Sequence, residues 1–241
     1  MLHGGAPAAL LAYGVEQARA PGLQPARMTI DLFRPVPKAP LELRTQEVRT
    51  GRRIQVLETS LWHEGREMCR ATNLLLRPAD VTVPETAHFP QGLPADPATL
   101  PTGSLMPEGM RRRGAPPGLH TTIEVKRITP PNTGEGGHHA AWIRIPVQVV
   151  EGEPNTPLVR VAGVSDFGNG LANIRIDDSA GFINADINLH LHREPVGEWV
   201  CLDAHSSAGD NGLGLIRTTL YDEVGPIGYA VQAIMANPRA D

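Results

Sequence analysis

GFINADINLHLHREPVGEWVCLDAHSS, at residues 181–207, is the stretch that decides the fold of this chain. From Asp186 to His192 its polar and apolar residues alternate strictly. A period of two places successive side chains on opposite faces of a β-strand. One face can therefore lie on a core, while the other carries a carboxylate, an amide and two imidazoles. After the corner at Glu194–Gly197 a second strand is expected, so the stretch predicts two consecutive strands, with a plain solvated surface as the alternative for the polar face.

The composition narrows the class of protein. The chain has 241 residues, which is enough for one large domain or two of ordinary size. A net charge of −4 gives no electrostatic footprint for nucleic acid. No apolar run approaches the ~20 residues of a membrane span, and Met1–Gly5 does not begin a signal peptide. Cys69 and Cys201 are too few for a disulfide framework and lie in apolar runs, which predicts buried free thiols and a cytoplasmic protein.

The first part of the chain predicts one helix followed by four strands. Ala6–Ala20 carries a helical apolar stripe, and Gly4–Gly5 before it allows close backbone approach at the positive end of that helix. A helix followed by antiparallel strands indicates an α+β layer in which the sheet wraps the helix. The expected strands are Arg27–Arg34, Leu41–Val48, Arg53–Trp62 and Glu67–Leu76, the last two joined by a hairpin turn at His63–Arg66.

A segment rich in proline and glycine, Val83–Leu119, separates this part from a second one. It contains Arg111–Arg113, which we interpret as a solvated turn, with the binding of an anionic ligand as the alternative. A second helix is expected at Pro157–Phe167, with Thr156 as its N-cap and with Gly168 and Gly170 ending it. The other elements expected in the second part are strands Thr121–Ile128, Trp142–Val149, Gly214–Tyr221 and Ile227–Ala236, and a loop at Thr133–His139 whose histidines are not expected to be ligands.

The two parts repeat one unit. Arg34 at the end of MTIDLFR corresponds to Arg193 at the end of NLHLHR, and Trp62 in LETSLW corresponds to Tyr221 in IRTTLY. Both pairs are 159 positions apart (193 − 34 and 221 − 62). A duplication of this length predicts two helix-and-sheet units packed as a pseudo-dimer with their sheets side by side.

These motifs resemble the acyl-CoA thioesterase family with the double hotdog fold, which includes bacterial thioesterase II. The resemblance rests on HGGAPAAL (3–10), FINADINLHLHR followed by GEW (182–199) and GLGLIRTTLYDEVGPIGYAVQ (212–232). It implies two tandem hotdog units, residues 1–80 and 120–241, each an antiparallel sheet wrapped round a central helix, with a linker at 81–119. Family members usually carry a strand or two before the first helix. The first unit is therefore expected to lack its first strands and to leave a sheet edge that needs covering.

The resemblance also implies hydrolysis of a fatty or related acyl-CoA, with no covalent enzyme intermediate, cofactor or metal. In the family an aspartate, a hydroxyl residue and a glutamine hold the attacking water, and these fall on Asp186, Ser207 and Gln232. Asp186 would act as the general base, while Ser207 and Gln232 would orient the water. Asp166 is the alternative carboxylate, because some hotdog enzymes use an acid on the helix, and Ser206 is the alternative hydroxyl.

Several further expectations complete the interpretation. The N–H groups of Gly4 and Gly5 are the candidate donors to the thioester oxyanion, at the junction of the two units. A metal site of Asp186, His190 and His192 is the main chemical rival, but residues four apart on a strand lie ~13 Å from each other. No GxSxG motif supports a serine hydrolase. The functional alternatives are a non-catalytic acyl-CoA-binding protein and a hotdog dehydratase, although neither predicted helix carries a dehydratase histidine. A homodimer or higher homo-oligomer and a role in fatty acid metabolism are also expected.

Overall fold

The computed structural model describes residues 1–105, 116–131, 134–176 and 180–238. The elements in chain order are α1 (Gly5–Ala18), β1 (Gln24–Leu32), β2 (Glu42–Thr50), β3 (Ile54–His63), β4 (Arg66–Leu76), the 3₁₀ turns η1 (Glu85–Ala87) and η2 (Pro97–Thr99), β5 (Thr102–Gly103), α3 (Leu119–Thr122), β6 (Glu124–Arg127), β7 (Gly137–Arg144), α4 (Pro157–Ser165), α5 (Phe167–Leu171), β8 (Ala180–Asn184), β9 (Asp186–Leu191), β10 (Val200–Ala208), β11 (Leu213–Tyr221) and β12 (Pro226–Pro238).

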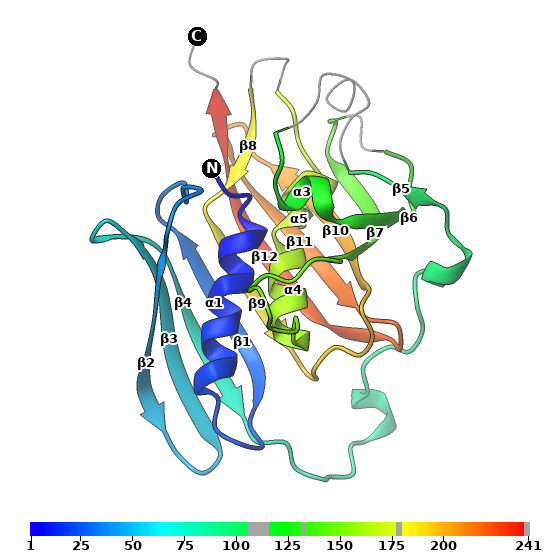
Figure 1. Cartoon of the computed structure of the whole chain (residues 1–241). Coiled ribbons are helices and arrows are strands. Elements are labelled where there is room, and N and C mark those ends of the chain that lie inside the picture. Colours follow the sequence, from blue (N-terminus) through cyan, green and yellow to red (C-terminus); the bar gives the residue numbers. More distant parts are fainter. Residues whose placement is uncertain (106–115, 132–133, 177–179, 239–241) are drawn as a thin grey trace.

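The strands form one antiparallel sheet, and α1 and α4 lie side by side against its inner face (Figure 1). The strand order is β2-β3-β4-β1-β9-β12-β11-β10-β7-β6-β5, with β8 also paired to β12. The β1–β9 pairing therefore joins the sheets of the two units. This is the double hotdog architecture that the sequence predicts.

The join between the units has pseudo-two-fold symmetry. Arg27 pairs with His190, and Asp31 pairs with Asp186. A shift of 159 carries position 27 to 186 and position 31 to 190, so each pair is converted into the other. Such exchange of residues is what an isologous interface requires. The same shift separates the first residues of β3 and β11 (213 − 54).

The second unit has two strands, β6 and β7, before its helix, and β7 pairs with the outer edge of β10. β2 is the counterpart of β10 in the first unit, and among the described strands it pairs with β3 alone. Its side chains are exposed except that of Leu43, which is half-buried. β2 is thus an open sheet edge, and its arginines and glutamates discourage pairing with other strands.

The core lies between the helix pair and the sheet. Ile187 and Leu189 of β9 are fully buried, and the side chains that alternate with them face outward. A slip of one residue in register would expose both, at about 1.5–3 kcal/mol for each side chain. The register of the central strands is therefore fixed by the core, as the alternation predicts.

Several local predictions are wrong. The strand expected at Trp142–Val149 is β7 (Gly137–Arg144), which begins five residues earlier and ends at Arg144. His138 and His139 lie on β7 and not in a loop, because the turn ends at Gly136 (φ 78°) and the strand begins at Gly137. Gly168 and Gly170 do not end the second helix, which continues as α5 after a break at Asp166. The strand expected at Thr121–Ile128 is in fact α3 followed by the short β6.

The described parts of the linker lie over the second unit. The indole Nε1–H of Trp142 donates to the carbonyl oxygen of Ala95 at 2.9 Å. The ring of Phe89 stacks on His192 with centroids 3.6 Å apart. The Arg111–Arg113 run lies outside the described residues.

Both cysteines are free and buried, as the sequence predicts. Burial raises the pKa of the Cys69 thiol to about 12, and it also raises the pKa of Cys201. Both thiols therefore stay protonated at neutral pH. None of the helices in the described part of the chain is long and apolar enough to cross a bilayer.

Candidate active site

Asp166 follows α4 and is buried where the two units meet. Its side chain is 6% exposed, and Oδ2 lies 3.0 Å from Nδ1 of His3. Oδ1 accepts a hydrogen bond from Asn184 Nδ2 at 2.9 Å. The backbone N–H of Gly5 also lies beside the His3–Asp166 pair and helps to lower the pKa of the carboxyl group. Because His3 and Gly5 belong to the first unit and Asp166 and Asn184 to the second, the carboxylate is held from both sides of the junction.

His3 is fixed in place by its neighbours. Its ring stacks on Phe167, with centroids 4.3 Å apart, and lies 5.6 Å from the ring of His120. Its Nδ1 faces Asp166 and is also 3.2 Å from the backbone nitrogen of Gly5. One ring nitrogen cannot donate and accept at once, so we assign a proton to Nδ1, which then donates to Asp166.

Two glycines allow the start of α1 to approach this carboxylate. A Cβ on Gly4 would lie 2.7 Å from Oδ1 of Asp166. A Cβ on Gly5 would lie 2.3 Å from the backbone oxygen of Gly163 in α4. Gly163 is itself confined, since its own Cβ would lie 3.2 Å from that of Ala9. The close crossing of α1 and α4 therefore depends on these small residues, and it brings the positive end of α1 to Asp166.

Asp166 is held in its charged form. Burial by itself raises the pKa of this carboxyl group. The hydrogen bond and electrostatic attraction of His3, with the hydrogen bonds from Asn184 and Gly5, outweigh burial and bring the pKa below its ordinary value. The group is thus a buried carboxylate at neutral pH.

A β-bulge directs Asn184 to this carboxylate. Along β12, Val231 pairs with Asn188 of β9, and Ile234 pairs with Asn184 of β8. Two residues of β12 (232–233) therefore lie opposite three residues of the partner (185–187). The extra residue breaks the alternation, so Asn184 falls on the inner face beside Ile234. Without the bulge this amide would face outward.

Gln232 lies on the same inner face and is 1% exposed. Neither its Oε1 nor its Nε2 has a hydrogen-bond partner among the described residues, and the same is true of Oγ1 of Thr218. Both side chains lie against Gly168, two residues after Asp166, where a Cβ would be 2.7 Å from Gln232 Oε1 and 3.0 Å from Thr218 Oγ1. A buried amide without a partner is costly. The unpaired amide of Gln232 is therefore available to form hydrogen bonds with a bound ligand.

The structure does not bring Asp186 or Ser207 to this cluster. Asp186 lies on the outer face of β9, where Oδ1 accepts a hydrogen bond from the backbone N–H of Ala233 at 2.6 Å. Ser207 is exposed near the end of β10. Ser206 points inward, but its Oγ accepts a hydrogen bond from the N–H of Gly137 at 2.9 Å. The grouping of Asp186, Ser207 and Gln232 that the sequence suggests is thus divided between the two faces of the sheet.

The rival metal site of Asp186, His190 and His192 also fails to assemble. His192 is engaged by the ring of Phe89, and the carboxylate of Asp186 is bonded to the backbone and to Asn188. These three residues are not among the described groups whose ligand atoms lie within 4.8 Å of one another.

Pseudo-two-fold symmetry relates the two ends of the helix pair. The side chains at the second end differ in chemistry from those around Asp166. Arg19 follows the end of α1, whereas Asp166 lies at the break between α4 and α5. The offset between β4 and β12 is 160 (226 − 66), which sets Thr72 in the place of Gln232. A cavity of about 450 Å³ opens at this end, but Arg19 there is paired with Glu16 and Glu194. In the described part of the chain, the arrangement of Asp166 thus occurs at one end of the helix pair.

Sequence reasoning missed His3, Asn184 and Thr218. Thr218 could have been identified from the sequence pattern, since it is a polar residue on the apolar side of a strand, between Ile216 and Leu220. Asn184 could not, because a bulge changes the face of a residue without changing the local sequence pattern.

Comparison with known proteins agrees with this architecture. Models of the N-terminal and C-terminal domains of acyl-CoA thioesterases match residues 1–76 and 90–236. No curated protein sequence matches the chain.

Solved structures share the fold at low identity. An acyl-CoA thioesterase II, TesB2, from Mycobacterium marinum is 15% identical, with a TM-score of 0.70, over 99% of this chain and 90% of that one. A tesB protein of Mycobacterium avium subs paratuberculosis is 16% identical, with a TM-score of 0.68, over 99% of this chain and 88% of that one. The CurJ dehydratase is 11% identical, with a TM-score of 0.57, over 98% of this chain and 83% of that one.

Proposed function

The chain belongs to the acyl-CoA thioesterase family, and on that premise we propose that it hydrolyses a fatty or related acyl-CoA to the free acid and coenzyme A with a water molecule activated at Asp166. The observation that carries the proposal is the buried, charged carboxylate of Asp166 on the same inner face as Gln232, whose amide has no partner among the described residues.

Asp166 is the general base of this proposal. It takes a proton from water while the water oxygen attacks the thioester carbonyl carbon. The tetrahedral intermediate then expels the coenzyme A sulfur, which receives the proton held by Asp166. His3, Asn184 and Gly5 hold the carboxylate in place and occupy part of its hydrogen-bonding capacity, so the remaining lone pair is directed to the water.

In this proposal Gln232 supplies a hydrogen-bond donor for the thioester carbonyl and an acceptor for the attacking water. Its Nε2 can donate to the carbonyl oxygen, where negative charge develops, and its Oε1 can accept from the water. The N–H of Gly5 faces the His3–Asp166 pair: the nitrogen is 3.2 Å from Nδ1 of His3, and the group helps to lower the pKa of Asp166. The glycine pair Gly4–Gly5, expected as an oxyanion site, is therefore assigned here to holding the base.

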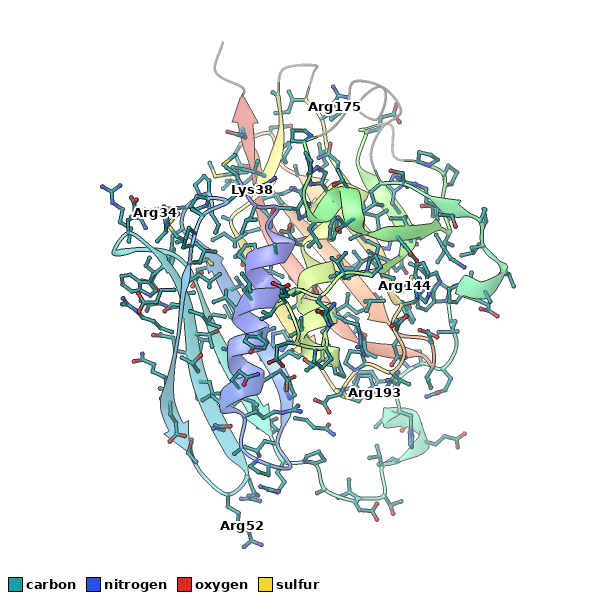
Figure 2. All side chains as sticks on the ribbon, viewed as in Figure 1. Arg34, Lys38, Arg52, Arg144, Arg175 and Arg193 are labelled. Atoms are coloured by element: carbon teal, nitrogen blue, oxygen red, sulfur yellow. The ribbon has the colours of Figure 1, made fainter. Side chains whose placement is uncertain are left out.

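Positive charge beside the site suits a coenzyme A substrate, which carries phosphates. Figure 2 shows Lys38 near the N-terminal end of α1. Burial, with nearby positive charge from His3 and Lys38, lowers the pKa of His120. Lys38 therefore lies at the same end of the molecule as His3 and His120, where its charge can attract the anionic part of the substrate.

A dehydratase is the second candidate, and the His3–Asp166 contact favours it. Hotdog dehydratases commonly use a histidine and an aspartate, and this pair brings together one residue from each unit. In a dehydratase the two groups act on different atoms of the substrate. Here Nδ1 of His3 is bonded directly to Asp166, which suits a positioned base better than a separate acid and base.

The test is the release of free thiol from a series of acyl-CoAs of increasing chain length, with a 3-hydroxyacyl-CoA included. We expect thiol release from at least one chain length and no enoyl product. Enoyl formation without thiol release would favour the dehydratase, and neither reaction would favour an acyl-CoA-binding protein.

The proposal includes association of the chain into a two-fold dimer, which is the commonest assembly of soluble oligomers. Light scattering at micromolar concentration should give about twice the chain mass of 25.9 kDa. A mass equal to that of one chain would contradict this expectation.

A further inference from the structure

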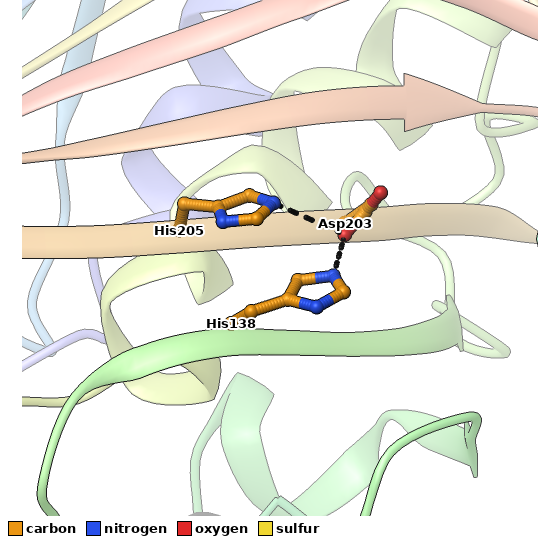
Figure 3. A group of neighbouring side chains, drawn as sticks. All are labelled: His138, Asp203 and His205. Carbon is orange, nitrogen blue, oxygen red and sulfur yellow. Dashed lines mark hydrogen bonds and ion pairs between the residues drawn. The ribbon is translucent and has the colours of Figure 1, made fainter.

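Three side chains capable of binding a metal ion converge on the outer face of the second unit, away from the inner face that carries Asp166. They are His138 of β7, and Asp203 and His205 of β10 (Figure 3). His138 and His205 are directly paired across the two strands, and Asp203 precedes His205 by two positions. Cross-strand partners and residues two apart on a strand share one face. The sheet itself therefore gathers the three side chains.

The ligand atoms are already close together. Nε2 of His138 is bonded to Oδ1 of Asp203, and Nε2 of His205 lies 3.9 Å from the same oxygen. All three ligand atoms lie within 4.8 Å of one another. The imidazole rings are stacked almost in parallel, with centroids 4.2 Å apart and an angle of 7° between their planes. Both Nε2 atoms thus face the same carboxylate, as they would in a shared coordination sphere.

We propose that His138, Asp203 and His205 form a binding site for a divalent transition-metal ion, with Zn²⁺ as the representative. Two imidazole nitrogens and one carboxylate oxygen are ligands that zinc prefers, whereas magnesium and calcium select sites made of oxygen atoms. Zinc needs ligand bonds of ~2.0–2.2 Å. Tetrahedral ligands with such bonds lie roughly 3.3 Å from one another, so an ion can enter only if the direct His138–Asp203 contact opens and His205 moves closer. Both histidines are about half exposed, which leaves room for this adjustment.

The solvent exposure of His138 and His205 determines the coordination and the affinity of the proposed site. The side chains of His138 and His205 are 50% and 48% exposed, so water can complete the coordination of the ion. Arg217 pairs with His205 across β10 and β11 and carries a charge that opposes a bound cation. We therefore expect affinity in the micromolar range and a ligation that clips β7 to β10.

The experiment uses untagged protein that has been treated with a chelator and then dialysed. Zn²⁺ is titrated by calorimetry, and Co²⁺ is titrated by its visible absorption, which reports directly on the coordinating groups. The variants are His138→Asn, Asp203→Asn and His205→Asn. His190→Asn is the matched control, since His190 is an exposed histidine on the outer face of β9. Thermal unfolding without metal checks that each variant is folded.

We expect one ion per chain, at least a tenfold loss of affinity in each of the three variants, and unchanged binding in His190→Asn. Zn²⁺ should also raise the melting temperature of the wild type and not that of His205→Asn, because a ligand that binds the folded state stabilises it. Absence of saturable binding, or equal losses in His190→Asn, would overturn the proposal and leave the cluster as a surface ion pair. The readouts are binding and melting temperature, so they do not depend on hydrolysis at Asp166.

Discussion

Replacement of Gln232 by an apolar residue should raise the stability of the fold and lower the rate of hydrolysis. The amide of Gln232 is 1% exposed, and neither of its polar atoms has a partner among the described residues. A buried polar group without a partner costs about 1–3 kcal/mol. Gln232→Met keeps nearly the same volume and removes that cost, so the variant should be more stable by about 1–3 kcal/mol. In a chain of this length that corresponds to a rise of about 2–12 °C in melting temperature.

The same change should slow hydrolysis. Removal of one donor that stabilises developing negative charge typically lowers turnover by about 10²–10³-fold. Gln55 provides the matched control, because it is also buried in a strand, at 2% exposure. Its Oε1 accepts from Ala20 N at 2.9 Å, and its Nε2 donates to Ala18 O at 3.2 Å. Gln55→Met leaves both backbone groups without their partner, so it should lower stability and leave turnover nearly unchanged.

The assays are thiol release from the best acyl-CoA and thermal unfolding of the wild type and both variants. If Gln232→Met loses as much stability as Gln55→Met, or turns over at the wild-type rate, the amide is a structural group. The role assigned to it in the mechanism would then be wrong.

The remaining predictions concern Asp166 and the helix crossing that holds it. Gly5→Ala places a Cβ 2.3 Å from the oxygen of Gly163, so it should destabilise the fold by about 1–3 kcal/mol and lower turnover. Gly170→Ala, whose Cβ would meet nothing within 4 Å, should stay within about 1 kcal/mol of the wild type in unfolding experiments; equal effects of the two would contradict the account of the crossing. The pKa of Asp166 is below its ordinary value in the folded state, so its stabilisation is present above the unfolded pKa of ~3.9 and is lost as pH falls through the folded pKa. The stability gap between the wild type and Asp166→Asn, measured by denaturant unfolding, should therefore shrink below about pH 4, and a gap that stays constant or widens would show that this sign is wrong.

Much of the fold could be predicted from the sequence because the signals are local and repeated. Alternation from Asp186 to Leu191 fixed which side of β9 faces the core, and the shift of 159 predicted that two sheets would join side by side. The N-cap at Thr156 is present, with its Oγ1 accepting from Val159 N at 3.4 Å. These features depend on a few neighbouring residues, so sequence pattern is enough to find them.

The active-site cluster was harder to predict because its parts meet through long-range packing. His3 and Asp166 are far apart in the sequence, and their contact depends on how closely α1 and α4 cross. The bulge at residues 185–187 turns Asn184 inward with no local signal, and it separates Asp186 from Gln232. Sequence reasoning therefore found the glutamine and named Asp166 as an alternative, but it gave first place to the carboxylate on the strand.

The most direct test of the central proposal compares the turnover of two variants, Asp166→Asn and Asp186→Asn, on the same acyl-CoA. Asp166→Asn removes the proposed base, so turnover should fall by about 10²–10⁴-fold. Asp186→Asn keeps an oxygen that can accept the hydrogen bond from Ala233, and its turnover should stay close to that of the wild type. Loss of turnover in Asp186→Asn, with Asp166→Asn near the wild-type rate, would place the base on β9 and contradict the mechanism.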